Sequence, residues 1–310
     1  MANANIYKVI TEKMIARIES AIENKEKFSW VKPWNGIPTG NYLNYLKDGD
    51  EMSEYRGINR LLLDGGLYLT YKQIYELSKK TGEKYTIPKG TPMETVYFYK
   101  MRIVEKKDED GNPVLDENGE IVKNRFAMMR FYGVYNVADI EGLDVEIPVN
   151  EYDETVLTKT ADILIKDFMK RTGVKIVSKK GIDKAYYMPS THTVTVPYKG
   201  QFKTIEQFYA TVFHELVHST GKQLGRDMSG AFGKEKYGFE ELVAELGSAF
   251  IMQSIGFDVT KTGENSAAYL KSWLKVFKED TSFIVKASNK AQAASDLFFN
   301  VAYKEAEKVA

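Results

Sequence analysis

The chain has 310 residues, of which 43% are hydrophobic and 28% charged, so it can bury two cores of ordinary domain size. Lys and Arg together number 43, as do Asp and Glu, so the overall charge gives no sign of a nucleic-acid or membrane partner. The chain has no cysteine, which excludes a disulfide framework and a thiolate metal site.

The N-terminal segment is predicted to be an amphipathic helix. Apolar residues recur at helical spacing from Ile6 to Ile22, so one face of the helix is expected to pack on a domain. The N-terminus has no basic region followed by an apolar run, and no stretch approaches 18 apolar residues. We therefore expect a soluble, unexported protein of the cytoplasm, without a membrane partner.

An aromatic segment with proline and lysine follows this helix. Trp30 and Trp34 flank Lys32, a combination that suits stacking on the bases of single-stranded nucleic acid. The competing interpretation is a loop whose tryptophans fill the core, and we prefer it for at least one of them. Further along, Arg56 and Arg60 are one helical turn apart with Asn59 between them, which predicts a phosphate-binding face.

Two long strands are predicted over residues 95–104 and 124–137, which are dense in β-branched and aromatic residues. The basic residues interleaved in these strands are Lys100, Arg102, Arg125 and Arg130. Residues 105–123 between them carry turn signals and predict a protruding acidic hairpin. Outside residues 105–124, the first 140 residues hold 18 Lys and Arg against 13 Asp and Glu. This mild basic excess permits nucleic-acid binding without requiring it.

The second half of the chain begins after an acidic, proline-containing linker at residues 142–152. The predicted order is an amphipathic helix from Thr155, strands at 174–177 and 185–197, two helices, and then two closing helices at 266–279 and 283–304. His192 lies in an alternating stretch, so its ring is expected to face solvent. We predict an α+β protein with domains at residues 1–141 and 153–310.

The most specific motif is His214-Glu215-Leu216-Val217-His218, the H-E-x-x-H signature of zinc hydrolases. Two His residues at i and i+4 share one face of a helix, so both imidazoles reach one metal ion. Thr204 is the expected N-cap of this helix and Gly221 its stop. The competing interpretation is a core helix with two buried His.

A catalytic zinc needs a third protein ligand, and the helix that starts near Gly238 offers carboxylates one turn apart. We assign Glu241 as this ligand and Glu245 to accept the free N–H of a liganding His. The reverse assignment, with Glu245 as the ligand, satisfies the same spacing. Glu240 points elsewhere on the helix and is expected to be solvated or to act as a cap. Zn²⁺ held in this way would activate water, with Glu215 as general base.

Over nearly its full length the chain resembles the ArdC-type antirestriction proteins of conjugative plasmids, which are related to TraC-like primase accessory proteins. In the first half, Trp30-Val-Lys-Pro-Trp34, the segment Tyr55–Leu63, Thr70-Tyr-Lys-Gln73 and Val134-Tyr-Asn-Val137 resemble their single-stranded-DNA-binding domain. In the second half, the segments Phe213–Gly221, Phe239–Gly247 and Ser272–Asp280 resemble their zincin-like metallopeptidase domain. The acidic insert at 105–123 and the loop after Gly221 depart from that pattern.

This resemblance implies a protein that binds single-stranded DNA, protects incoming plasmid DNA from restriction, and carries a metal site. The candidate DNA-contacting residues are Trp30, Lys32, Trp34, Arg56, Asn59, Arg60, Tyr71 and Lys72. A protein substrate would be a component of host restriction. The metal is expected to be zinc, with manganese or cobalt as alternatives. The competing function is a non-proteolytic DNA-binding antirestriction module with a structural or regulatory metal.

Overall fold

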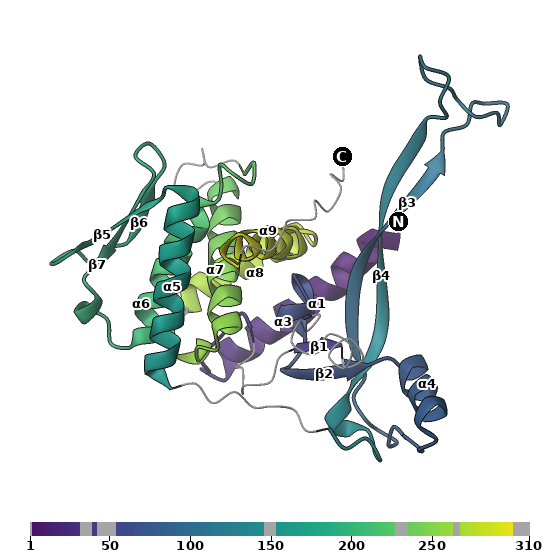
Figure 1. The fold of residues 1–310 in the computed structure, drawn as a ribbon, viewed down its shortest axis with the longest axis horizontal. Helices are drawn as coiled ribbons and strands as arrows, with labels where there is room; N and C mark the ends of the chain where they lie inside the picture. Colours follow the sequence, from purple (N-terminus) through teal and green to yellow (C-terminus); the bar gives the residue numbers. More distant parts are fainter. Residues whose placement is uncertain are drawn as a thin grey trace.

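The structure is a computed structural model and describes residues 2–31, 39–41, 54–145, 153–226, 235–262 and 267–299. Figure 1 shows a long two-stranded ribbon on one side of the molecule and a group of packed helices with a small sheet on the other. The mixed helix and sheet content confirms the predicted α+β class. Among the described helices, none combines the length and apolarity needed to cross a lipid bilayer.

The N-terminal helix α1 (Ala2–Glu23) packs its apolar stripe as predicted, with Ile10, Met14 and Ile18 fully buried. It contacts the helices α8 (Ala267–Glu279) and α9 (Phe283–Phe298) of the second half and also strand β4 (Lys123–Asn136) of the first. The Thr11 hydroxyl donates to the backbone oxygen of Thr281 at 2.6 Å. Helix α1 therefore connects the two halves.

The first half contains a four-stranded sheet in the order β1-β2-β4-β3. Strand β1 (Thr39–Asn41) runs parallel to β2 (Gly66–Leu69), which pairs for two residues with β4 (Lys123–Asn136). Strand β3 (Glu94–Glu105) pairs antiparallel with β4 along its whole length, so the two form the ribbon that projects in Figure 1. At its tip, Asp108 and Asp116 each accept two backbone N–H groups and hold two successive tight loops.

Two short helices flank this sheet. Helix α4 (Tyr71–Thr81) is capped by Thr70, whose hydroxyl accepts the N–H of Gln73 at 3.2 Å. Helix α3 (Ile58–Leu62) is buried between the sheet and the C-terminal helices. The turn η1 (Val137–Asp139) closes this half.

The second half stacks helices beside a three-stranded sheet in the order β5-β7-β6. Its elements, in chain order, are α5 (Glu154–Thr172), β5 (Lys175–Lys179), β6 (Tyr186–Met188), β7 (Thr193–Pro197), η2 (Lys199–Gln201), α6 (Ile205–Ser219), α7 (Glu235–Ile255), η3 (Val259–Lys261), α8 and α9. Among the strands that the structure describes, β6 is an edge strand, paired with β7 alone. The predicted end of the last helix, beyond residue 299, lies outside the described residues.

One cluster of buried side chains extends through both halves, from Ile10 on α1 and Ile58 on α3 to Phe250 on α7 and Phe277 on α8. Within the first half, the guanidinium of Arg17 ties α1 to the following segments by donating to three backbone oxygens, those of Ser29, Trp30 and Leu61. We propose residues 1–141 and 153–310 as the domains, with α1 and α3 of the first packed on the second.

Candidate metal centre

Helices α6 and α7 lie side by side and carry the residues of the zinc-hydrolase motif. Helix α6 begins as predicted, because the Thr204 hydroxyl accepts the N–H of Gln207 at 3.2 Å. The two helices approach closely at Gly247, where an added Cβ would lie 2.9 Å from a methyl group of Val217. A residue without a side chain at this position therefore sets the separation of the two helices.

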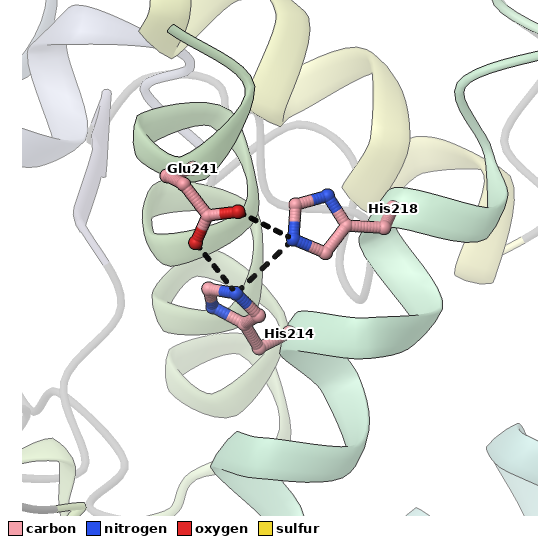
Figure 2. Close-up of side chains that lie close together, drawn as sticks. All are labelled: His214, His218 and Glu241. Atoms are coloured by element: carbon pink, nitrogen blue, oxygen red, sulfur yellow. Dashed lines mark hydrogen bonds and ion pairs between the residues drawn. The ribbon is translucent and has the colours of Figure 1, made fainter. Parts of the chain in front are cut away.

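Three side chains predicted to be ligands converge between these helices. Figure 2 shows His214 and His218 on successive turns of α6, with Glu241 of α7 facing both rings. The Nε2 atoms of the two imidazoles are 3.2 Å apart. The Glu241 carboxylate places one oxygen 3.5 Å from Nε2 of His214 and the other 3.4 Å from Nε2 of His218.

This geometry fits a divalent transition metal. Tetrahedral ligand atoms with bonds of about 2.0–2.2 Å lie about 3.3–3.6 Å from one another. The three separations in the structure, 3.2, 3.4 and 3.5 Å, lie within or close to this range. Two nitrogens and one oxygen suit zinc, and also manganese or cobalt. All three side chains are largely buried, with exposed fractions of 18%, 9% and 20% for His214, His218 and Glu241.

Glu240 lies behind His218. The sequence-based prediction that Glu240 is solvated or caps a helix was therefore wrong. Its side chain is 10% exposed, and Oε1 is 3.2 Å from Nδ1 of His218. Arg226 holds the same carboxylate through two hydrogen bonds, from Nε at 2.9 Å and from a terminal nitrogen at 2.8 Å. Glu240 therefore fixes the orientation of the His218 ring, so that Nε2 faces the other two side chains.

Arg226 also ties this arrangement to the end of helix α6. It donates to the Thr220 hydroxyl and to the backbone oxygen of Val217, both at 2.7 Å. Its side chain is 3% exposed, although it lies in the loop after Gly221 that departs from the family pattern. The sequence gives no sign that this arginine is buried, because charged residues in polar loops are usually exposed. Glu240 could have been found, since a second carboxylate directly before the predicted ligand Glu241 is a candidate to support a liganding His.

Glu245 lies on the opposite side of the site, with Oε1 3.8 Å from Nδ1 of His214. This contact is on the outer nitrogen of the ring, where the predicted supporting role would place it, but it is longer than a hydrogen bond. Among the described residues, the group whose ligand atoms converge contains Glu241 and does not contain Glu245. The geometry thus favours Glu241 over Glu245 as the third ligand.

Charge and burial oppose each other at these groups. Burial lowers the pKa of His218, but its contacts with Glu240 and Glu241 outweigh this effect and raise the pKa to about 9. Burial raises the pKa of Glu241, but hydrogen bonds with His214 and His218 hold it well below its usual range. A metal ion at the Nε2 atoms would replace the proton of His218, since binding requires a neutral imidazole.

Glu215 lies beside the three converging side chains and points toward strand β6. It is 8% exposed, and burial raises the pKa of its carboxyl, while the neighbouring His214 and His218 oppose the shift. Its carboxylate accepts a hydrogen bond from the backbone of Tyr187. This contact places the predicted general base beside a backbone group of the edge strand β6.

His192 lies in the turn before β7 and does not extend into solvent as predicted. Its backbone adopts a left-handed conformation with φ of 49°, which breaks the expected alternation. The ring is held by the Tyr187 hydroxyl at 2.8 Å and by the backbone oxygen of Thr172 at 3.2 Å. His192 therefore fixes strand β6 in place and lies apart from the three converging side chains.

Three residues predicted to contact DNA have partners inside the protein. Trp30 is 3% exposed and packs in the core. The amide of Asn59 pairs with both backbone groups of Tyr97, each at 2.8 Å. Arg60 is 5% exposed and donates to the amide oxygen of Gln253 at 2.7 and 3.0 Å. Trp30 and Arg60 therefore contact helices of the second half, whereas Asn59 holds β3 within the first half.

The other predicted DNA residues differ in their surroundings. Arg56 is half exposed and forms an ion pair with the buried Asp296 of α9. Tyr71 is 69% exposed at the start of α4, and the neighbouring Lys72 side chain is 83% exposed. Lys32 and Trp34 lie outside the described residues. Tyr71 and Lys72 therefore remain accessible to a ligand.

Comparison with known proteins gives two family matches in the order expected from the sequence. Residues 4–135 match the N-terminal domain of the anti-restriction factor ArdC. Residues 164–290 match a zincin-like metallopeptidase family. The second match includes both helices of the candidate metal centre.

Similar full-length proteins include two Escherichia coli proteins, each named DNA primase TraC. The chain is 30% identical to one and 29% identical to the other, with 97% of this chain aligned in each case. It spans only 20% and 28% of their lengths. An uncharacterized protein of Sinorhizobium fredii, y4eC, is 29% identical, with 94% of this chain and 91% of that protein aligned.

Similar solved structures include two crystal structures of the antirestriction protein ArdC from plasmid R388. The metal-free form has a TM-score of 0.66 and 29% identity, covering 95% of this chain and 97% of that one. The Mn(II)-bound form has a TM-score of 0.64 and 26% identity, covering 96% of this chain and 98% of that one. The likeness thus extends over both halves of the molecule.

Proposed function

The chain belongs to the ArdC-type antirestriction proteins, joining their N-terminal domain to a zincin-like metallopeptidase domain, and we propose that it binds single-stranded DNA and hydrolyses peptide bonds at a divalent-metal site. The observation that carries the hydrolase proposal is the convergence of His214, His218 and Glu241 beside the buried Glu215. We propose zinc as the native ion, with manganese as the alternative that the R388 relative suggests.

The residues of the site would have different roles in peptide hydrolysis. His214, His218 and Glu241 would hold the ion, which supplies Lewis acidity that polarises a peptide carbonyl and acidifies water. The Glu215 carboxylate would accept the proton of the attacking water and deliver it to the leaving amine. Burial suits Glu215 to this task, because a raised pKa brings a carboxyl closer to the range in which it exchanges protons near neutral pH.

Strand β6 supports an extended peptide as the substrate. A peptide added along its unpaired edge would form backbone hydrogen bonds and lie next to Glu215, whose carboxylate already accepts a hydrogen bond from Tyr187 of that strand. The His192 contacts with Tyr187 and Thr172 hold this edge in a fixed position. A component of the host restriction system is the protein substrate that the antirestriction family implies.

The test measures metal content and peptide cleavage on the purified full chain, using the wild type, Glu215→Gln and Glu241→Ala. Glu215→Gln is expected to keep one ion per chain and to lose cleavage by at least about 100-fold. Glu241→Ala is expected to lose both the ion and the activity. Cleavage that persists in Glu215→Gln would refute the assigned base, and full metal binding in Glu241→Ala would refute the ligand set.

A second assay separates hydrolysis from antirestriction. Plasmid DNA is transferred into a restricting host that produces either the wild type or Glu215→Gln. If the protein acts by cleaving a restriction component, the variant gives no protection. If Glu215→Gln protects as well as the wild type, protection depends on DNA binding alone, and the metal has a structural or regulatory role.

A further inference from the structure

We propose that one face of the β3–β4 ribbon binds single-stranded DNA through two exposed aromatic rings and two arginines. The four residues, called the ribbon face below, are Phe98, Arg102, Arg130 and Tyr132. The inference deepens the proposed DNA-binding function by naming its surface. It replaces the buried candidates Trp30, Asn59 and Arg60.

The strand register places these four side chains on the same face. Phe98 lies directly opposite Arg130, while Tyr132 lies opposite Val96, two residues before Phe98. Because side chains alternate across a strand, Phe98 and Arg102 share a face, and so do Arg130 and Tyr132 on the partner strand. Contact between the rings agrees with this, since the centroids of Phe98 and Tyr132 are 5.8 Å apart.

Both rings are accessible to solvent, although aromatic side chains that contact one another are usually buried. Phe98 is 41% exposed and Tyr132 is 47% exposed. Bases stack on such rings with little dependence on sequence, at about 1–3 kcal/mol per base. An exposed pair of rings on a projecting ribbon is therefore a stacking surface for unpaired bases.

The base of the ribbon face is rigidly supported. Val96 and Val134 continue the same face toward the sheet, where they are buried with Tyr55 and Tyr68. The ring of Tyr55 lies 6.4 Å from that of Phe98. Ligand binding on Phe98 thus requires little ordering of the protein.

The charge of the ribbon face suits a nucleic-acid backbone. Arg102 and Arg130 are both exposed, and Arg102 lies about 13 Å along the strand from Phe98. That length accommodates several stacked bases at about 3.4 Å each. Beyond Arg102 comes the acidic tip, where residues 105–124 hold 7 Asp and Glu against 3 Lys. Repulsion from the tip would direct the strand toward Tyr132 rather than outward.

The experiment measures binding of a fluorescent 20-nucleotide oligothymidine by anisotropy, with the full chain at several salt concentrations. The Phe98→Ala, Tyr132→Ala double variant is expected to weaken binding by at least about 30-fold without changing the salt slope. The Arg102→Ala, Arg130→Ala double variant is expected to lower the slope of log K against log salt by about 1.4.

The matched control is Phe131→Ala, which removes an exposed ring, 60% accessible, from the opposite face of the same strand and should bind as the wild type does. Circular dichroism and metal content verify that each variant is folded. If the wild type binds and both double variants bind equally well, the assignment of the ribbon face as the DNA-binding surface is refuted, while the proposed DNA-binding function stands. If the wild type does not bind, or prefers a duplex of equal length, both proposals fail.

Discussion

Glu240→Gln tests whether the carboxylate behind His218 stabilises the metal centre, because the substitution keeps the shape of the side chain and removes its charge. In the wild type this carboxylate lies 3.2 Å from Nδ1 of His218 and accepts hydrogen bonds of 2.8 and 2.9 Å from the Arg226 guanidinium. The amide would still fill the space but would present N–H groups to one of these two donors. Two separate effects are therefore expected, one on metal affinity and one on stability.

The metal effect follows from the orientation of the His218 ring. Loss of a carboxylate behind a liganding imidazole typically costs 10- to 100-fold in affinity, or about 1.4–2.7 kcal/mol. The stability effect follows from Arg226, whose side chain is 3% exposed and would lose its charge partner. Removing one partner of a buried ion pair costs about 3–5 kcal/mol.

The assay combines calorimetric titration with Zn²⁺ and Mn²⁺ and thermal unfolding of the metal-free protein. The double variant Arg226→Met, Glu240→Gln separates the two effects, because it removes the unpaired charge but not the misorientation of His218. We expect it to recover most of the lost stability while metal affinity stays reduced. Wild-type affinity in Glu240→Gln would refute the role assigned to Glu240, and so would full recovery of affinity in the double variant.

Three further predictions concern other parts of the molecule. Gly247→Ala should force helices α6 and α7 apart, and it should therefore destabilise the fold by about 1–3 kcal/mol and weaken metal binding. Gly238→Ala is the control on the same helix, because a methyl group has room there. In melting and titration experiments it should change neither stability nor metal affinity. Arg60→Met should lower the melting temperature, because it leaves the buried amide of Gln253 without its donor at a cost of about 1–3 kcal/mol, while oligothymidine affinity stays unchanged. His192→Phe should lower peptide cleavage but not metal affinity, since it releases the Tyr187 hydroxyl and loosens strand β6; equal cleavage would remove His192 from the positioning of the substrate edge.

Local helix geometry made the centre of the site predictable from the sequence. The His214 and His218 rings share a face because four residues make about one turn, and this holds in any helix. The Thr204 cap depends only on the residues next to it. The need for a third ligand pointed to the carboxylates of the next helix, but the spacing alone admitted both Glu241 and Glu245.

The role of Glu240 depends on a relation between two helices, which the sequence of either helix does not contain. Its position one residue before Glu241 suggested solvent, but the crossing of α6 and α7 places it against His218 instead. Arg226 was missed for a related reason, because loop arginines are exposed by default and only the folded arrangement buries this one.

Three of the predicted DNA contacts, Trp30, Asn59 and Arg60, are buried for a different reason. Basic and polar residues one helical turn apart suit a phosphate surface and equally suit contacts inside a protein. Asn59 and Arg60 use their polar groups to hold Tyr97 of β3 and Gln253 of α7. The exposed alternation of Phe98 and Arg102 on β3 was visible in the sequence as interleaved aromatic and basic residues, but which face lies open required the sheet register.

Anomalous diffraction from crystals of the full chain grown with Zn²⁺ or Mn²⁺ would locate the metal ion itself. We expect a single strong peak between helices α6 and α7, at about 2.0–2.3 Å from Nε2 of His214, Nε2 of His218 and a carboxylate oxygen of Glu241. A bound ion located elsewhere, or one that contacts Glu245 in place of Glu241, would contradict this expectation.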